Sequence, residues 1–95
     1  MPSSTAVVVT AKPSPYLKQL CKHFGHRIEV QFTDEDGRIV FGAGVCELDA
    51  RRADALVLRA IADDAEGLDV VQNVVAKHLE RFGRRDELAV AWTAD

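Results

Sequence analysis

The chain has 95 residues, of which 47% are hydrophobic and 28% charged, with a formal net charge of −3. This length supports one hydrophobic core, so we expect residues 1–95 to form a single domain. The lack of a basic run, and of any stretch near the roughly 20 apolar residues of a membrane span, argues against nucleic-acid and membrane partners.

A strand and a short helix are predicted for the first quarter of the chain. Residues 5–10 are rich in β-branched side chains, which favour a strand. Ser14 is a suitable N-cap, and Pro15 suits the first helical position, where its missing N–H is not needed. One face of the helix carries the apolar residues Leu17, Leu20, Cys21 and Phe24 at helical spacing. Gly25 is expected to end the helix in the left-handed conformation.

After Gly25 the hydrophobic period changes to two, which predicts strands. Residues 27–32 alternate, with Ile28, Val30 and Phe32 on one side. Residues 34–37 end in Asp-Gly, which is typical of a hairpin turn. Further strands are predicted at 38–41, 45–49 and 55–62. The last is assigned as a strand because its short length and flanking turn residues favour that over a helix.

The second helix follows a capping-box pattern. Asp63 provides an oxygen acceptor, and Glu66 lies three residues later. An apolar stripe then runs along the helix and consists of Leu68, Val71, Val75, His78, Leu79 and Phe82. Gly83 is expected to end this helix, and the alternating apolar residues of 87–92 predict a short terminal strand.

These elements predict an α+β fold with the order β-α-β-β-β-β-α-β. Strands joined by short turns pair antiparallel, so the sheet is expected to be antiparallel. Two amphipathic helices on one face of the sheet give a two-layer sandwich. The other face is expected to be solvated, with opposite charges satisfying one another. It would carry Glu29, Gln31, Arg38, Glu47 and Arg59.

Four segments resemble a small bacterial family. They are residues 20–26 (LCKHFGH), 37–41 (GRIVF), 76–82 (AKHLERF) and 87–92 (ELAVAW). In these segments, and in their order along nearly the whole chain, the sequence is similar to the family called domain of unknown function 2218. That family has no established activity and no agreed catalytic residues, so the resemblance assigns none to this chain.

The resemblance implies an association with iron handling. Similar domains occur next to, or fused with, siderophore-interacting flavin reductases, which makes such a reductase a candidate partner. The element order also resembles TATA-binding-protein-like folds. Only the shape would be shared, because the mixed-charge sheet face lacks the basic, apolar-wedged surface that bends DNA.

The cysteines and the N-terminus indicate the compartment. Cys21 and Cys46 lie within apolar patterns and are expected to be buried free thiols. Cytosolic proteins rarely contain disulfides, and the N-terminus lacks the pattern of a secretion signal. We therefore expect a bacterial cytoplasmic location.

The three histidines are the first candidates for ligand contacts. His23 and His26 lie at the exit of the first helix, and His78 lies within the apolar stripe of the second. Cys21-x-His23-x-x-His26 superficially resembles a metal motif, but residues two apart on a helix point roughly 200° apart. We therefore expect no metal and no cofactor. A looser three-histidine constellation is the alternative if the two helices lie side by side. His78 itself is interpreted either as a residue at the edge of the core or as a ligand or pH-sensitive contact.

Two arginine pairs are candidates for binding an anion. Arg51-Arg52 and Arg84-Arg85 would hold a carboxylate or a phosphate if the fold brought them to one end of the sheet. The alternative is ordinary surface charge near Asp54 and Asp86. The acidic residues 34–36 are interpreted as a solvated turn, because a calcium loop needs more oxygen ligands.

These patterns favour a non-enzymatic small-ligand-binding or accessory module. No serine lies in a nucleophile motif. The alternative is a small enzyme that uses His78 with Cys21 or His23 in a pocket between helix and sheet. A third hypothesis is a homodimer that forms through the open sheet or through an edge strand at 88–92.

Overall fold

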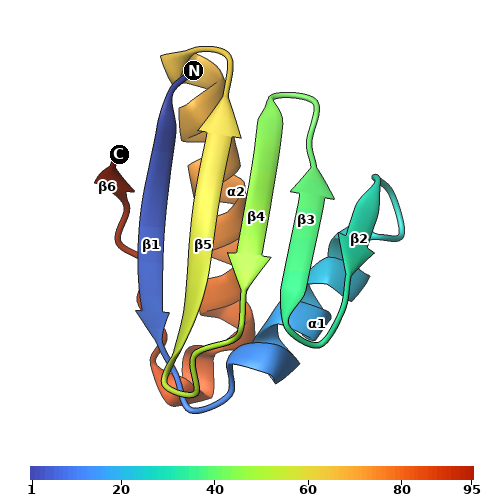
Figure 1. Cartoon of the computed structure of the whole chain (residues 1–95), viewed down its shortest axis with the longest axis vertical. Helices are drawn as coiled ribbons and strands as arrows, with labels where there is room; N and C mark the ends of the chain where they lie inside the picture. Colours follow the sequence, from blue (N-terminus) through green and yellow to red (C-terminus); the bar gives the residue numbers. More distant parts are fainter.

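One antiparallel sheet of six strands forms the main layer of the protein (Figure 1). The computed structural model describes residues 1–95. In chain order the elements are β1 (Ser3–Val9), α1 (Pro13–Phe24), β2 (Val30–Phe32), β3 (Asp36–Val40), β4 (Gly44–Asp49), β5 (Ala55–Ala62), α2 (Ala65–Phe82), a short 3₁₀ helix η1 (Arg84–Asp86) and β6 (Thr93–Ala94). The strands lie in the order β2-β3-β4-β5-β1-β6, and all neighbours pair antiparallel. The predicted α+β fold and its element order are confirmed.

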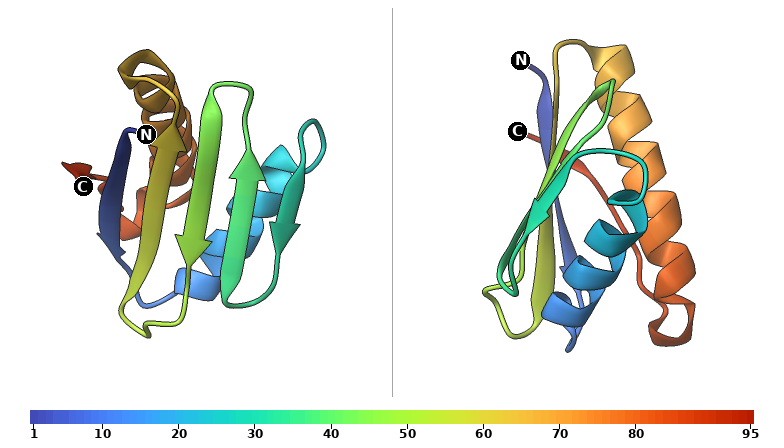
Figure 2. Two further views of the ribbon diagram at one scale, coloured as in Figure 1. Left: turned by 45° about the horizontal axis from the view of Figure 1, so that its top comes forward. Right: turned by 90° about the vertical axis from the view of Figure 1, so that its right-hand side faces the viewer.

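Both helices cover the same face of the sheet, so the protein has two layers (Figure 2). Even-numbered residues of β1 and β5 point toward the helices, and the register places Ala6 beside Leu58 and Val8 beside Leu56. The helices contribute the fully buried side chains Leu17, Leu20, Cys21, Val71, Val75 and Leu79. Burying one leucine or valine stabilises a fold by roughly 1.5–3 kcal/mol. The two apolar stripes therefore hold both helices on this face.

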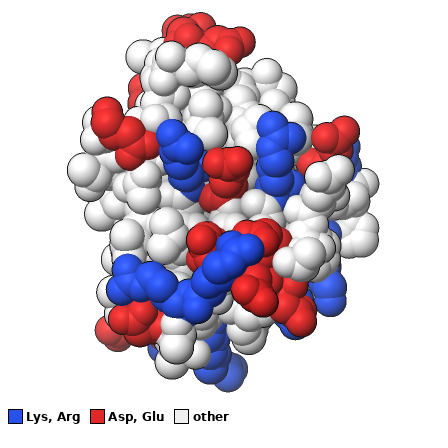
Figure 3. All heavy atoms as spheres, in the orientation of Figure 1, with Lys and Arg blue, Asp and Glu red and all other residues white.

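The opposite face of the sheet carries neighbouring charges of opposite sign (Figure 3). A row across the sheet places Arg38 beside Glu47, and Glu47 beside Arg59. The Arg59 guanidinium lies 4.0 Å from the Glu47 carboxylate and 3.4 Å from that of Asp95. Glu47 and Asp95 thus balance Arg59, as predicted for this face, whereas Arg38 lies beside Glu47 in the register but makes no ion pair.

The first helix begins and ends differently from the prediction. Pro13 is the first helical residue, and Lys12 is the N-cap without a side-chain hydrogen bond, so Ser14 is not the cap. A proline is compatible with the first turn because N–H groups there have no helical partner. Gly25 ends α1 with a right-handed φ of −62°, and its N–H donates to the carbonyl of Cys21. The predicted left-handed conformation is therefore wrong.

Strand β2 begins later than predicted, at Val30 instead of residue 27. The backbone N–H groups of Arg27 and Ile28 both donate to the carbonyl of Phe24. These residues therefore extend the turn that follows α1 and do not join the sheet.

Gly37 lies within β3, so the hairpin turn predicted at 34–37 is placed too late. The turn is formed by residues 33–35, and the Thr33 hydroxyl accepts a hydrogen bond from the N–H of Asp36. A side chain at Gly37 would place its Cβ 2.9 Å from Cys21 Sγ. The glycine is required by the close packing of α1 on β3, and not by a turn.

The N-cap of α2 is one residue later than predicted. Asp64 occupies this position, and its carboxylate accepts a hydrogen bond of 2.7 Å from the N–H of Gly67. Asp63, the predicted cap, lies outside the helix in the connection from β5. The capping chemistry is as expected, but two adjacent aspartates made the boundary ambiguous.

The terminal strand is shorter and later than predicted. Residues 88–92 run without pairing to the sheet, and β6 pairs with β1 through Thr93 and Ala94. Leu88, Val90 and Trp92 pack against the hydrophobic core. Their alternation therefore reflects burial of every second side chain and not strand pairing.

The strand predicted at 55–62 is confirmed as β5, which lies between β4 and β1. Neither helix combines the length and the apolar composition that crossing a bilayer requires. The resemblance to TATA-binding-protein-like folds is not confirmed by these observations and stays a prediction.

Candidate functional site

The end of α1, the turn after it and the middle of α2 surround a cleft of about 570 Å³. We call it the histidine–phenylalanine cleft; its lining residues are His23, Phe24, His26, Arg27, Ile28, Phe41, Val74 and His78. The cleft exists because α1 ends at Phe24 and the chain turns through residues 25–29 before it enters the sheet.

Aromatic rings form the walls of this cleft and orient one another. The ring centroid of Phe24 lies 5.1 Å from that of Phe41 and 5.2 Å from that of His23, with interplanar angles of 82° and 81°. His23 lies 5.0 Å from His78 and 5.3 Å from Phe82. The edge-to-face pairs are Phe24 with Phe41, and His23 with Phe24 and with Phe82; such pairs are favoured by the ring quadrupole, whereas His23 and His78 are tilted by 45°. The walls are therefore held in place by contacts between rings from both helices and from the end of β3.

The orientation of His78 is fixed by a hydrogen bond within α2. Its Nδ1 lies 2.7 Å from the carbonyl oxygen of Val74, one turn earlier. A carbonyl oxygen can only accept, so Nδ1 carries the proton and donates it. In the neutral imidazole, Nε2 is then an acceptor. The neutral His78 ring therefore offers Nε2 to a bound molecule.

All three predicted histidines line this cleft, with His23 and His26 exposed and His78 half-buried. The fold thus brings the end of α1 next to the middle of α2, although the two helices are far apart in the sequence. No group of three or more His, Cys, Asp or Glu side chains is arranged to hold a metal ion. The looser three-histidine constellation is therefore a shared lining and not a formed metal site.

Cys21 is buried on the sheet side of α1 and does not line the cleft. Its Sγ lies against Gly37 of β3, and burial raises its pKa to about 11. The thiol is therefore protonated at neutral pH, which makes it a poor nucleophile. Burial also raises the pKa of Cys46. The hydrogen bond of His78 goes to Val74, so the Cys21–His78 dyad considered from the sequence is not formed.

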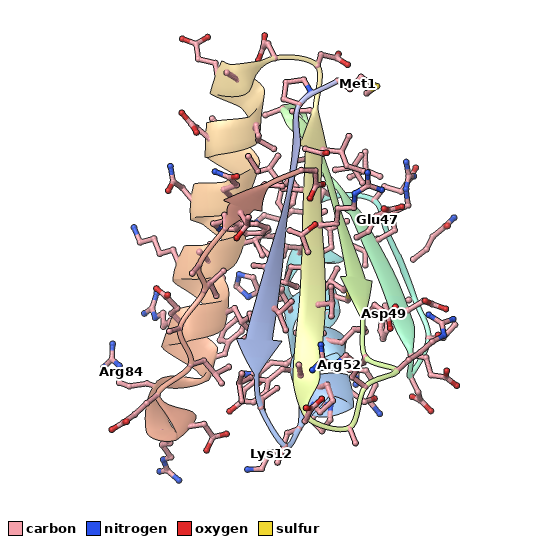
Figure 4. The ribbon with its side chains drawn as sticks, turned by 60° about the vertical axis from the view of Figure 1, so that its left-hand side comes forward. Met1, Lys12, Glu47, Asp49, Arg52 and Arg84 are labelled. Carbon is pink, nitrogen blue, oxygen red and sulfur yellow. The ribbon has the colours of Figure 1, made fainter.

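A second cleft, of about 520 Å³, lies between the start of α1 and the end of α2. We call it the basic cleft; it is lined by Lys12, Tyr16, Arg81, Phe82, Arg84, Arg85 and Asp86. Figure 4 shows Lys12 and Arg84 at the same end of the molecule. The two clefts adjoin at Phe82, which lines the basic cleft and packs against His23.

Asp86 holds the two sides of the basic cleft together. The Tyr16 hydroxyl donates a hydrogen bond to its carboxylate, and Lys12 Nζ lies 3.8 Å from the same group. The hydrogen bond to Asp86, together with burial, raises the pKa of Tyr16. The remaining cations of the cleft have no carboxylate within ion-pairing distance; they are Arg81, Arg84 and Arg85.

The other arginine pair lines neither cleft. The Arg51 guanidinium makes two hydrogen bonds with the Asp36 carboxylate and lies 3.5 Å from that of Glu35. Arg52 pairs with Asp54 at 3.1 Å. The acidic turn after β2 thus neutralises Arg51, and the hypothesis of one anion site built from both arginine pairs is not realised.

Sequence reasoning missed several residues of both clefts. Phe24 and Phe82 were assigned to the core because they continue the apolar stripes of their helices. Each lies at the end of its stripe, where the ring packs against the core but is only partly buried. Tyr16 is the single tyrosine of the chain. A buried tyrosine usually finds a hydrogen-bond partner, and this is the signal that could have linked it to Asp86.

Comparison with known proteins gives two similarities. Residues 5–93 match the family described as "Uncharacterized protein conserved in bacteria (DUF2218)". The NMR structure of PA4090 from Pseudomonas aeruginosa is 41% identical to this chain, with a TM-score of 0.81. That likeness covers 98% of this chain and 96% of the other. No curated protein matches the chain.

Proposed function

The chain belongs to the uncharacterised bacterial family DUF2218, and we propose that it is a small-ligand-binding or accessory module rather than an enzyme. Its ligand is a planar aromatic acid that binds in the histidine–phenylalanine cleft. One observation carries this proposal: the cleft combines walls made of aromatic rings with positive charge that no carboxylate of the protein neutralises.

The shape and walls of the cleft favour a flat ring. Its volume of about 570 Å³ lies within the range of roughly 300–1,000 Å³ that is usual for small-molecule sites. Phe24, Phe41 and His78 offer ring faces and edges, and a bound aromatic ring would extend the edge-to-face pair of Phe24 with Phe41 and the tilted pair of Phe24 with His78. An aliphatic ligand of the same size would gain the burial but not the ring contacts.

The polar groups of the cleft favour a carboxylate and a hydroxyl on that ring. Arg27 makes no ion pair, and its guanidinium is suited to bind a carboxylate through two hydrogen bonds. Nε2 of neutral His78 accepts a hydrogen bond, which a phenolic hydroxyl can donate. Salicylate combines these groups and is a suitable probe.

We also propose that the module serves iron–siderophore metabolism in the bacterial cytoplasm, with a siderophore-interacting flavin reductase as its partner. Phenolic oxygens are hard donors that bind ferric iron, so a cleft for hydroxylated aromatic acids is compatible with this role. Two free, buried cysteines are compatible with a reducing compartment. A pull-down with such a reductase and a titration with a ferric siderophore test the link. If neither gives binding tighter than millimolar, the iron link is abandoned.

Isothermal titration calorimetry with salicylate tests the aromatic site. We expect a Kd below about 1 mM, a binding free energy more favourable than about −4 kcal/mol. Cyclohexanecarboxylate, which lacks a π system, should bind several times more weakly. Phe41→Leu should weaken salicylate binding by between about twofold and tenfold, because ring pairs contribute about 0.5–1.5 kcal/mol.

Matched controls separate the cleft from general effects of the substitutions. Phe32→Leu removes a ring that lies in β2 and lines no part of the cleft, so salicylate affinity should be unchanged. Arg27→Gln should weaken binding, whereas Arg38→Gln, which removes the same charge from the open sheet face, should not. Equal affinity for salicylate and cyclohexanecarboxylate, or equal effects of the two phenylalanine substitutions, would contradict the proposal.

Self-association through the open sheet face is a second candidate function. Val7 and Val9 of β1 are 49% and 78% exposed on that face. The large side chains of residues 88–92 pack against the core, so we take the open face as the surface for a dimer. Analytical ultracentrifugation should then show a dimer that Val9→Lys dissociates. A monomer at all concentrations would exclude this role.

A further inference from the structure

The basic cleft shares no lining residue with the histidine–phenylalanine cleft. Its geometry points to the binding of a phosphate group, either as inorganic phosphate or as part of a small phosphorylated compound. Four of its lining residues are cations, Lys12, Arg81, Arg84 and Arg85, and one is an acid, Asp86. The cleft therefore has an excess of three positive charges, in a chain whose net charge is −3.

The arginines of the cleft are available to a ligand. Arg81, Arg84 and Arg85 are exposed and make no ion pair. Arg51 of the same protein behaves differently, because the acidic turn supplies it with carboxylates. Unpaired cations that line a concave surface raise the local positive potential and attract anions. The two arginine pairs thus differ in availability, although both lie at the same end of the sheet.

The turn that carries Arg84 and Arg85 is held to the protein by hydrogen bonds and by packing. The N–H groups of Asp86 and Leu88 both donate to the carbonyl of Gly83, at 3.0 and 3.2 Å. A Cβ at Gly83 would lie 2.3 Å from Leu88 Cδ1, so the turn is packed directly on the core. The hydrogen bond from Tyr16 to Asp86 ties the same turn to α1. A preorganised turn of this kind lowers the entropic cost of binding.

The chemistry of the cleft favours phosphate over a simple carboxylate. Planar guanidinium groups match phosphate oxygens through paired hydrogen bonds. A phosphate dianion can engage two arginines at once, whereas a single carboxylate leaves most of the excess charge unbalanced. The Tyr16 hydroxyl is already engaged with Asp86. The arginines, and not the phenol, are therefore the groups that contact the ligand.

NMR titration of the whole chain with inorganic phosphate at low ionic strength tests this site. The amide signals of Tyr16 and of residues 84–86 should shift, and those of Arg51 and Arg52 should not. Arg84→Gln should weaken binding about tenfold, since a charge-assisted hydrogen bond is lost. Arg38→Gln removes the same charge from the open sheet face and should change the affinity less than twofold.

Two further titrations, with phenyl phosphate and with acetate, test which kind of anion the cleft binds. Phenyl phosphate that binds more tightly than inorganic phosphate supports a phosphorylated compound as the ligand, and equal affinity supports free phosphate. Acetate that binds as tightly as phosphate, or equal losses in Arg84→Gln and Arg38→Gln, would overturn the proposal. Phe41→Leu should leave phosphate binding unchanged. A result that contradicts the phosphate site is therefore distinguishable from one that contradicts the proposed aromatic-acid site.

Discussion

Gly37 illustrates how one residue sets the distance between the two layers. It lies in β3 opposite Leu48, and its missing side chain leaves room for the Cys21 sulfur of α1. A Cβ at this position would lie 2.9 Å from Cys21 Sγ and 3.3 Å from Leu48 Cδ1. The approach of α1 to the sheet, and with it the position of the cleft at the end of α1, therefore depends on this glycine.

Gly37→Ala should lower the free energy of unfolding by about 1–3 kcal/mol, because the core has no space for the added methyl group. In a Cys21→Ala background the loss should be smaller, since the closest clashing atom is gone. Gly42→Ala is the control, because nothing lies within 4 Å of its added Cβ. Urea unfolding measures all four variants. Additive effects of the Gly37 and Cys21 substitutions would contradict the packing argument.

The two thiols should be unreactive in the folded protein. Burial raises the pKa of Cys21 to about 11 and also raises that of Cys46, so neither forms a thiolate near neutral pH. Iodoacetamide at pH 8 should leave both unmodified in the native state and label both in guanidinium chloride. Mass spectrometry counts the labels. Rapid native labelling of Cys21 would show that its environment is more open than described.

At the scale of elements, the N-cap of α2 gives a direct comparison between neighbouring residues. Asp64→Ala should destabilise the protein by about 1 kcal/mol, because the N–H of Gly67 loses its acceptor. Asp63→Ala should change stability by less than about 0.5 kcal/mol, since this exposed residue caps nothing. Thermal unfolding of the two variants distinguishes them. A larger loss for Asp63→Ala would restore the sequence-based assignment of the cap.

Elements whose burial follows a simple period were predicted well from the sequence. Strand β5 was predicted at its observed limits, and the stripe that holds α2 includes the buried Val71, Val75 and Leu79. Errors occurred where one pattern has two physical causes. A glycine such as Gly37 is expected both in a turn and where two elements pack closely, and here the second cause applies. The alternation of Leu88 and Val90 is expected both in a paired strand and in an unpaired extended segment that packs on the core.

The candidate sites could be predicted only in part. Three histidines and Arg84-Arg85 were identified from their chemistry, but the clefts depend on how α1 and α2 cross, which the sequence does not specify. The aromatic walls were assigned to the core for the same reason. Arg51 shows the converse, because its carboxylate partners become apparent only when β3 and β4 pair.

At the scale of the whole molecule, the two faces differ in character. The open sheet face places charges of opposite sign side by side, whereas the helix face carries both clefts and their unpaired arginines. Acid should therefore affect the two faces differently. Protonation breaks the ion pairs of the sheet and its turns, but it leaves the guanidinium groups of the basic cleft unchanged.

The stability of the protein should fall as the pH drops below about 4. Hydrogen bonds from the Arg51 guanidinium hold the pKa of Asp36 below its ordinary value of 3.8. Arg52 lowers the pKa of Asp54, and the hydroxyls of Ser3 and Thr5 lower that of Asp95. Carboxylates with a lowered pKa contribute stability above their unfolded pKa, and this contribution is lost as the pH falls through their folded pKa.

Asp36→Asn provides the check on this pH dependence. The wild type should have the higher Tm at pH 7, and the two Tm values should converge as the pH falls toward 2, because Asp36 resembles asparagine once it is protonated. Circular dichroism measures both. A constant difference in Tm across this range would show that the ion pair with Arg51 is not its cause.

The most direct test of the proposed function is an NMR map of salicylate binding over the whole chain. The amide signals of residues 23–28 and of Val74 to His78 should shift with one common Kd, while those of β1 and β5 on the open face stay unchanged. Phe41→Leu should reduce these shifts at equal ligand concentration. Shifts that are confined to the open sheet face, or no shift at millimolar salicylate, would contradict a ligand site between the two helices.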